Sequence, residues 1–350
     1  MYNVGIRKLS MSANRVHVST EGTHPLVCGD EVHEYVGFSA DDSIRWRATS
    51  GGVGTSIVKY LFEHNRITHA LSFSYDAETL QYVPNFVDAY EKYFQTGSVY
   101  QDIDIIGFCA KEFQHLKGCS VLVFALPCQS KAVRALGLRC GVDVIIIGLV
   151  CSSQQTMDAT FYLLRRLGIK RKNVATIKYR GGGWPGGIQL VLKNNETRFV
   201  PNNNSIWKKI FHSRLFAPKR CLRCISTRNE YADVVLADPW WIVSPNEEKK
   251  GKTLFFANTE IGRKLVKEML DVGAIVAERT DGKAFGKSAG STLERKASMR
   301  QNTLLRKIYY ALCTSSLYKR IVTLLPFLFE VHCTALAHVE RKILERGKAL

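Results

Sequence analysis

Apolar residues occur along this chain in short continuous runs, and each run is followed by a segment whose apolar positions repeat with helical spacing. Continuous apolar runs are typical of strands that are covered on both faces of a sheet. Strands that alternate with helices indicate an α/β fold with a largely parallel or mixed sheet and flanking helices. The clearest pairs are the strand 120–127 with the helix 130–138, the strand 142–150 with the helix 157–167, and the strand and helix within 254–269.

The pattern divides the chain into three parts. Residues 1–45 show short strands and turns with little helical periodicity, and residues 46–288 contain the alternating elements. Residues 289–350 are helical in pattern and basic, with 11 Lys/Arg and 4 Asp/Glu. We therefore expect an N-terminal strand and turn segment, a central α/β domain and an appended C-terminal helical tail.

The tail leaves two interpretations open. Its apolar residues stand among lysines and arginines, as in helices that lie at a membrane surface. A helix that packs on the central domain explains the same spacing, and we favour this second interpretation. The apolar positions in question are Leu304, Ile308, Leu312, Leu317, Ile321 and Leu324.

The formal net charge of the chain is +18, from 49 Lys/Arg and 31 Asp/Glu. Such an excess favours anionic partners: an acidic electron carrier, a phosphorylated cofactor or an anionic membrane surface. No nucleic acid is expected, because the chain has no helix-turn-helix, zinc-finger or RNA-recognition signature. The chain also has no apolar stretch of spanning length and no signal-peptide core, so we expect a cytoplasmic protein, with a peripheral location at the inner membrane as the alternative.

Four of the ten cysteines stand where a shared metal centre would need them. Cys128 and Cys151 follow predicted strands directly, and the carboxyl ends of parallel strands meet at one edge of a sheet. Cys221 and Cys224 form a C-x-x-C pair in which an arginine, Arg220 or Arg223, precedes each cysteine, and positive charge favours thiolate. Four cysteines are the usual ligands of a 4Fe–4S cluster and also of structural zinc. Cysteines at strand ends are often simply small buried hydrophobes, so the spacing leaves these interpretations open.

A glycine-rich turn precedes the predicted helix that begins near Val53. Ser50, Gly51 and Gly52 would present backbone N–H groups at the helix N-terminus, where a phosphate binds well. An ordinary glycine-rich connection is the alternative, since the turn matches neither the P-loop nor the dinucleotide fingerprint.

Two further segments are candidates for binding an aromatic or polar ligand. The loop 179–187 is rich in glycine and carries Trp184, which would stack on a planar ring or fill a hydrophobic gap. Asp233 and Asp238 flank a short apolar strand. They would either bind a ligand or form the turns at the two strand ends. No nucleophile elbow is present, and no catalytic residue is assigned.

In this order the motifs resemble the coenzyme F420 hydrogenase/dehydrogenase beta-subunit family, over about residues 45–258. The segments that carry the resemblance are Arg47-Ala-Thr-Ser-Gly-Gly-Val53, Pro127-Cys128-Gln129, Cys151, Gly183-Trp184-Pro185-Gly186, Cys221-x-x-Cys224, and Ala232-Asp233 followed by Asp238-x-Trp240.

The resemblance implies the cofactors. Members of the family are flavoproteins with 4Fe–4S clusters, so a cluster is expected on Cys128, Cys151, Cys221 and Cys224. FAD is expected at Ser50, Gly51, Gly52, Thr55, Arg180, Gly183, Trp184 and Asp238.

The resemblance also implies a function. We expect an oxidoreductase that passes electrons between a reduced carrier (ferredoxin or a deazaflavin coenzyme), the cluster and FAD to reduce an organic substrate, with a partner subunit as a further candidate. The alternative is a polysaccharide-biosynthesis protein of the same fold at the inner membrane, its redox function retained or lost. Two departures stand out: only Cys28 precedes the similar region, where many members have a ferredoxin-like segment, and Ala125 replaces a glycine.

Overall fold

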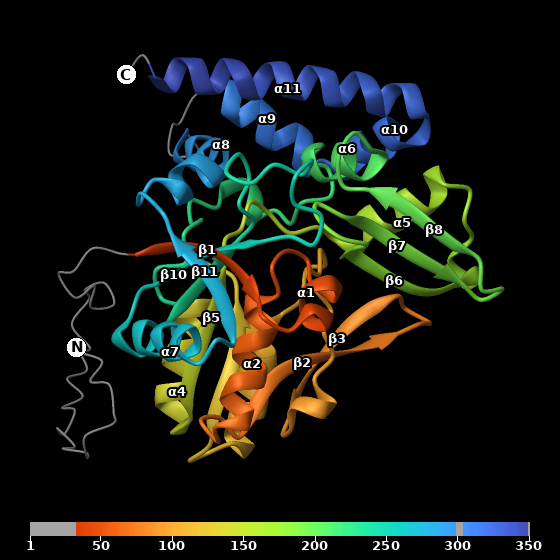
Figure 1. The fold of residues 1–350 in the computed structure, drawn as a ribbon. Helices are drawn as coiled ribbons and strands as arrows, with labels where there is room; N and C mark the ends of the chain where they lie inside the picture. Colours follow the sequence, from red (N-terminus) through yellow and green to blue (C-terminus); the bar gives the residue numbers. More distant parts are fainter. Residues whose placement is uncertain (1–32, 299–303, 349–350) are drawn as a thin grey trace, which may run out of the picture.

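The computed structural model describes residues 33–298 and 304–348 (Figure 1). Its centre is an eight-stranded sheet with the strand order β11-β1-β10-β9-β5-β4-β2-β3. Strands β2, β4, β5 and β9 pair in parallel, and the remaining pairs are antiparallel. The sheet is therefore mixed, as the sequence predicts. The bounds are β1 Glu34–Ser39, β2 His69–Asp76, β3 Gln81–Val87, β4 Ser120–Ala125, β5 Asp143–Leu149, β9 Val234–Ala237, β10 Thr253–Ala257 and β11 Ile275–Arg279.

Helices cover both faces of this sheet. Helices α2 (Val53–Glu63) and α7 (Glu260–Asp271) bury their apolar sides on the face that contains Leu122. Helices α3 (Ile105–Glu112) and α4 (Ser130–Cys140) pack on the opposite face, against the neighbouring residues of β4. Burial on both sides explains why β4 and β5 are continuously apolar in sequence.

A second, three-stranded antiparallel sheet stands beside the first (Figure 1). Its strands are β6 (Val174–Gly181), β7 (Gly187–Leu192) and β8 (Thr197–Pro201), and they form one core with α5 (Met157–Arg166) and α6 (Ile206–His212). The loop expected at 179–187 is shorter in the structure, because β6 extends to Gly181 and β7 starts at Gly187. Consecutive glycines at 181–183 and 186–187 hide these strand ends in the sequence, because glycine runs are typical of loops.

The region before residue 45 holds more than strands and turns. The strand β1 pairs with β10 and β11 inside the large sheet, and a helix α1 (Asp42–Arg47) follows. Asp41 caps this helix by accepting hydrogen bonds from Ser43 N and Ile44 N. A helix of six residues is too short to give a periodic signal, so the sequence does not predict it. The pattern predicted for residues 1–32 lies outside the described residues, and the divisions at residues 45 and 288 stay predictions.

The tail is helical, as predicted, and is packed onto the rest of the chain. Val322 and Phe329 join the core of the second sheet, while Tyr309, Cys313 and Leu336 pack around the segment that contains Cys221. Its helices are α8 (Ala284–Ser298), α9 (Leu304–Thr314), α10 (Ser316–Leu324) and α11 (Pro326–Lys348).

The six apolar tail residues singled out in the sequence lie on the opposite, solvent-exposed side of α9 and α10. The tail helices do pack on the rest of the chain, as the favoured interpretation predicts, but other residues of the same helices form the buried side. None of the described helices is long and apolar enough to cross a membrane.

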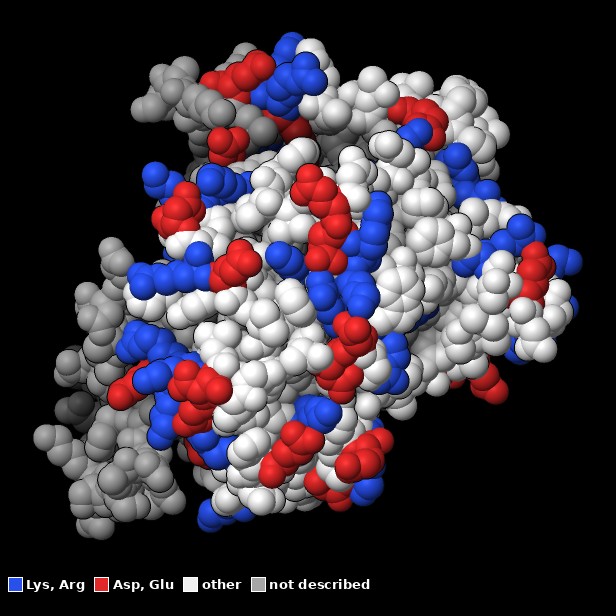
Figure 2. All heavy atoms as spheres, viewed as in Figure 1, with Lys and Arg blue, Asp and Glu red and all other residues white. Residues whose placement is uncertain are grey.

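Charged side chains of both signs share the face shown in Figure 2. Lysines and arginines alternate there with aspartates and glutamates over most elements. On this face the positive charge is consequently not gathered into a single basic patch.

Candidate functional site

A large cavity opens at the carboxyl ends of the parallel strands. Its volume is about 1080 Å³, and Ala125, Val150 and Ala237 line it directly at or after the ends of β4, β5 and β9. This is the place where open α/β sheets bind their ligands. The first turn of α2 forms another part of the wall, through Val53 and Thr55.

The α2 N-terminus presents backbone N–H groups to this cavity. Gly52 is the N-cap residue, has φ +81° and offers no side-chain cap. Only glycine adopts this left-handed conformation without strain. The N–H groups of a first helical turn have no partner within the helix, so Val53, Gly54 and Thr55 leave donors free for an anionic group at the cavity wall.

The predicted flavin residues divide into two groups. Ser50, Gly52, Thr55 and Asp238 line the cavity. The other four residues do not line the cavity: Gly51, Arg180, Gly183 and Trp184.

Close packing of the chain on itself explains the two glycines in the second group. A Cβ on Gly51 would stand 2.5 Å from the carbonyl oxygen of Gly37 and 2.6 Å from the N of Thr253. A Cβ on Gly183 would stand 2.6 Å from the carbonyl oxygen of Lys249. The side of Gly51 that a Cβ would occupy is filled by protein backbone, which gives this glycine a packing role, and its expected contact with FAD stays a prediction.

Arg180, Trp184 and Asp238 form a buried polar group behind the cavity. Arg180 donates to Asp238 with Nη1 at 2.6 Å, and Trp184 Nε1 lies 3.4 Å from the same carboxylate. Burial alone would lower the pKa of Arg180, but the Asp238 carboxylate outweighs it and raises that pKa. The guanidinium is therefore charged, and it fixes the orientation of Asp238.

Trp240 stands between Trp184 and the cavity. The two indole rings are 5.3 Å apart between centroids with an interplanar angle of 30°, and Trp240 lines the cavity. Trp184 is buried and fills the space behind its neighbour. Of the two roles that the sequence leaves open for Trp184, its burial favours filling a hydrophobic gap, and Trp240 is the tryptophan of the pair that lines the cavity.

The structure brings the four selected cysteines together. Cys128, Cys151, Cys221 and Cys224 all line one small cavity beside the large one. The parallel strands β4 and β5 end side by side, which places Cys128 and Cys151 at one edge. A 3-10 turn, Cys221–Arg223, carries the C-x-x-C pair to the same place.

Burial dominates the acidity of three of these thiols. It raises the pKa of Cys128, Cys151 and Cys221, and Arg220 opposes the shift at Cys128 and Cys221 only in part. The expectation that flanking arginines favour thiolate holds in direction, but burial is the larger effect. A cationic metal centre would supply the missing stabilisation of the thiolates.

No group of three or more His, Cys, Asp or Glu side chains in the described part of the chain is arranged to hold a single metal ion. The thiols of a four-iron cluster stand farther apart than the ligands of one ion, because iron and sulfide lie between them. Four thiols remain a ligand set that both structural zinc and an iron–sulfur cluster use.

The two cavities share a wall. Five residues line both of them: Leu126, Cys151, Ser152, Ser153 and Gln154. Ligands in the two cavities would therefore be neighbours, separated by the segment that follows β5.

One residue of the small cavity was missed in the sequence. Lys296, from the last turn of α8, lines it and lies 3.8 Å from Cys224 Sγ. It lies on the same side of the helix as the buried Phe285 and Ala289. A lysine in register with buried apolar residues was the available signal, and the many basic residues of the tail concealed it.

Comparison with known proteins identifies the family. The family description "coenzyme F420 hydrogenase/dehydrogenase, beta subunit N-term" matches residues 34–103, and the corresponding C-terminal description matches residues 119–283. The chain belongs to the coenzyme F420 hydrogenase/dehydrogenase beta-subunit family. The matched ranges contain all four cysteines and end before Lys296.

One sequence relative and one solved structure are similar to this chain. The F420-dependent formate dehydrogenase subunit beta of Methanocaldococcus jannaschii is 25% identical over 257 residues, which are 71% of this chain. The chain spans only 62% of that relative's length. A chain of the F420-reducing NiFe hydrogenase complex from Methanosarcina barkeri has a TM-score of 0.58 at 16% identity, covering 79% of this chain and 94% of the other. Members of the family are thus oxidoreductases, and the mixed α/β fold is shared.

Proposed function

We propose that this chain is an iron–sulfur flavoprotein redox subunit, with a 4Fe–4S cluster on Cys128, Cys151, Cys221 and Cys224 and FAD in the large cavity. The observation that carries the proposal is the wall common to the two cavities, formed in part by Cys151 itself. A cluster and a flavin exchange electrons well only when they are neighbours. The cluster stores single electrons, and the flavin exchanges electrons with an organic substrate or carrier.

The large cavity suits FAD. Its volume of about 1080 Å³ is at the upper end for ligand pockets, as a dinucleotide requires. The α2 N-terminus offers donors to a pyrophosphate, and Ser50 and Thr55 add hydroxyl groups. Trp240, which lines the cavity, offers an indole ring to a planar partner. Arg180 and Trp184 act indirectly by holding Asp238 and Trp240.

The side chains of the small cavity support a cluster, although its volume of about 10 Å³ is that of a single water molecule, so the lining must move apart to admit a cluster. Its four thiols are the full ligand set, and Arg220 and Lys296 line the same space and offset negative charge. A backbone hydrogen bond from Gln154 also lowers the pKa of Cys221, although burial remains the larger effect on that pKa. Hydrogen bonds of this kind stabilise sulfur that carries negative charge.

The names of the relatives support the choice of electron carrier. Their names specify F420-dependent and F420-reducing enzymes, so we extend to this chain an acidic carrier, either the deazaflavin coenzyme F420 or ferredoxin. The net charge of +18 attracts either of them. Both relatives are components of larger enzymes by name, and a partner subunit is accordingly part of the proposal. The relatives give no support to a role in polysaccharide biosynthesis.

Anaerobic purification tests the proposal. The wild-type protein is expected to contain iron, sulfide and FAD in a molar ratio of about 4:4:1 per chain. A double variant, Cys221→Ser with Cys224→Ser, should lose the iron and keep most of the flavin. Cys140→Ser is the matched control, because Cys140 does not line the small cavity. A colourless wild-type protein, or zinc in place of iron, contradicts the proposal.

A further inference from the structure

Lys296 is a fully buried cation. Only 2% of its surface is exposed, and its ammonium group donates to the carbonyl oxygens of Cys151, at 2.8 Å, and of Ser226. The third polar neighbour of the ammonium nitrogen is Cys224 Sγ, 3.8 Å from Nζ. Lysine is almost never buried to this extent without an anionic partner.

Two other buried cations of this chain have carboxylate partners, whereas Arg295 donates to Ser152 O and Oγ. Arg180 pairs with Asp238, and Arg214 pairs with Glu340 at 3.3 Å. No Asp or Glu within the described ranges forms an ion pair with Lys296, whose two hydrogen-bond acceptors are neutral carbonyls. Among the printed contacts of Lys296, the group able to carry a balancing negative charge is Cys224 Sγ, in the cysteine cavity that Lys296 lines.

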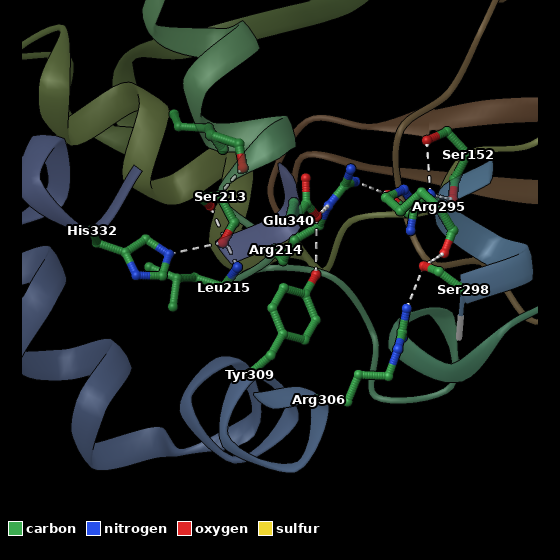
Figure 3. A network of polar contacts seen from close by, with 12 residues as sticks. Ser152, Ser213, Arg214, Leu215, Arg295, Ser298, Arg306, Tyr309, His332 and Glu340 are labelled. Atoms are coloured by element: carbon green, nitrogen blue, oxygen red, sulfur yellow. Dashed lines mark hydrogen bonds and ion pairs between the residues drawn. The ribbon is translucent and has the colours of Figure 1, made fainter. Parts of the chain in front are cut away.

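Neighbouring contacts hold Lys296 in place. Arg295, the preceding residue, donates to Ser152 O at 2.9 Å, and Ser298 Oγ donates to Arg295 O at 2.7 Å (Figure 3). Arg306 of α9 donates in turn to Ser298. The last turn of α8 is thus tied to the segment between the two cavities and to the rest of the tail. A side chain fixed in this way keeps its charge at a constant place.

We propose that Lys296 sets the reduction potential of the cluster, an inference that rests on the cluster of the proposed function. Reduction adds one electron, supplied by the reduced carrier, and forms or breaks no bond. The reduced cluster carries one more negative charge than the oxidised cluster, and a buried ammonium nearby stabilises that charge strongly. The positive charge of Lys296 raises the midpoint potential. It is a positioning residue of the tail, outside the two matched family regions.

Lys296→Met tests this inference, since methionine has similar length and no charge. The reduced fraction of the cluster is followed by electron paramagnetic resonance during a titration with dithionite. At a fixed potential the ratio of reduced to oxidised cluster should fall roughly tenfold, which corresponds to about 59 mV for a one-electron couple. The matched control is Lys287→Met on the same helix, whose side chain is 58% exposed and pairs with Asp281. Its titration should coincide with that of the wild type.

The outcomes separate the two proposals. A wild-type protein without a cluster overturns the proposed function and this inference with it. A K296M protein with full iron and an unchanged potential overturns the inference alone. If K296M loses its iron, the Tm of the metal-free proteins decides. An equal or higher Tm than that of metal-free wild type supports a charge role, because methionine removes an unpaired buried cation. A lower Tm shows a packing role and overturns the inference.

Discussion

Arg180 and Asp238 form an ion pair of 2.6 Å in which the arginine side chain is only 1% exposed. The pair joins the second sheet to the end of β9, since Arg180 belongs to β6 and Asp238 follows Ala237. Arg180 also donates to the carbonyl oxygen of Thr49 at 3.1 Å, just before the glycine turn. One buried guanidinium thus connects three segments around the large cavity.

Asp238→Asn is expected to destabilise the protein. The substitution leaves the Arg180 guanidinium buried without its counter-charge, and breaking such a pair costs about 3–5 kcal/mol in the free energy of unfolding. Chemical denaturation measures this change. Asp281→Asn, at an exposed ion pair, is the control and should leave the free energy of unfolding close to that of wild type. Equal stability of D238N and wild type would show that the pair does not hold this region together.

The tail should contribute to the stability of the whole chain. Phe329 is 0% exposed and its ring lies 4.9 Å from that of Tyr162, whereas Phe327 on the same helix is 60% exposed. Phe329→Ala should lower the free energy of unfolding by about 3–5 kcal/mol. Phe327→Ala should change it by less than about 0.5 kcal/mol. If both variants unfold like wild type, the tail is not packed on the second sheet.

Stability should fall on mild acidification because of His332. Burial lowers the pKa of His332, and the hydrogen bond to Ser213 O, 2.9 Å long, only partly opposes this shift. In the unfolded chain a histidine takes up a proton below about pH 6.5, and the folded chain resists that uptake. The contribution of neutral His332 to stability is therefore present above this pH and is lost as the pH falls.

Thermal unfolding between about pH 7.5 and about pH 5.5 checks this prediction. The Tm of wild type should decrease more over this interval than the Tm of His332→Gln, and the two values should converge at the acid end. His338, which is exposed on the same helix, supplies the control: His338→Gln should keep the full pH dependence of wild type. Parallel curves for wild type and H332Q would contradict the assignment.

The sequence predicts the parts of this structure that depend on local patterns. Continuous apolar runs locate β4 and β5, and the cysteines that follow them meet because parallel strands end at one edge. The sequence does not distinguish Trp184 from Trp240, because their order relative to the cavity depends on how two distant loops pack. Lys296 was missed for the same reason: its contact with Cys224 joins residues 72 positions apart. Long-range contacts of this kind leave no periodic trace.

Gly51→Ala distinguishes a packing glycine from a ligand-binding glycine. Because a Cβ at Gly51 would meet Gly37 O and Thr253 N at 2.5 and 2.6 Å, alanine must push β1 and β10 apart. Overpacking of this kind lowers the free energy of unfolding by about 1–3 kcal/mol. Gly286→Ala is the control, because no atom lies within 4 Å of its Cβ position in α8, and it should leave stability equal or slightly higher. Unfolding and bound FAD are measured together in both variants. A G51A protein of normal stability that has lost its flavin would show that Gly51 contacts the cofactor. A less stable protein that still binds FAD would show that Gly51 is needed for packing between β1 and β10.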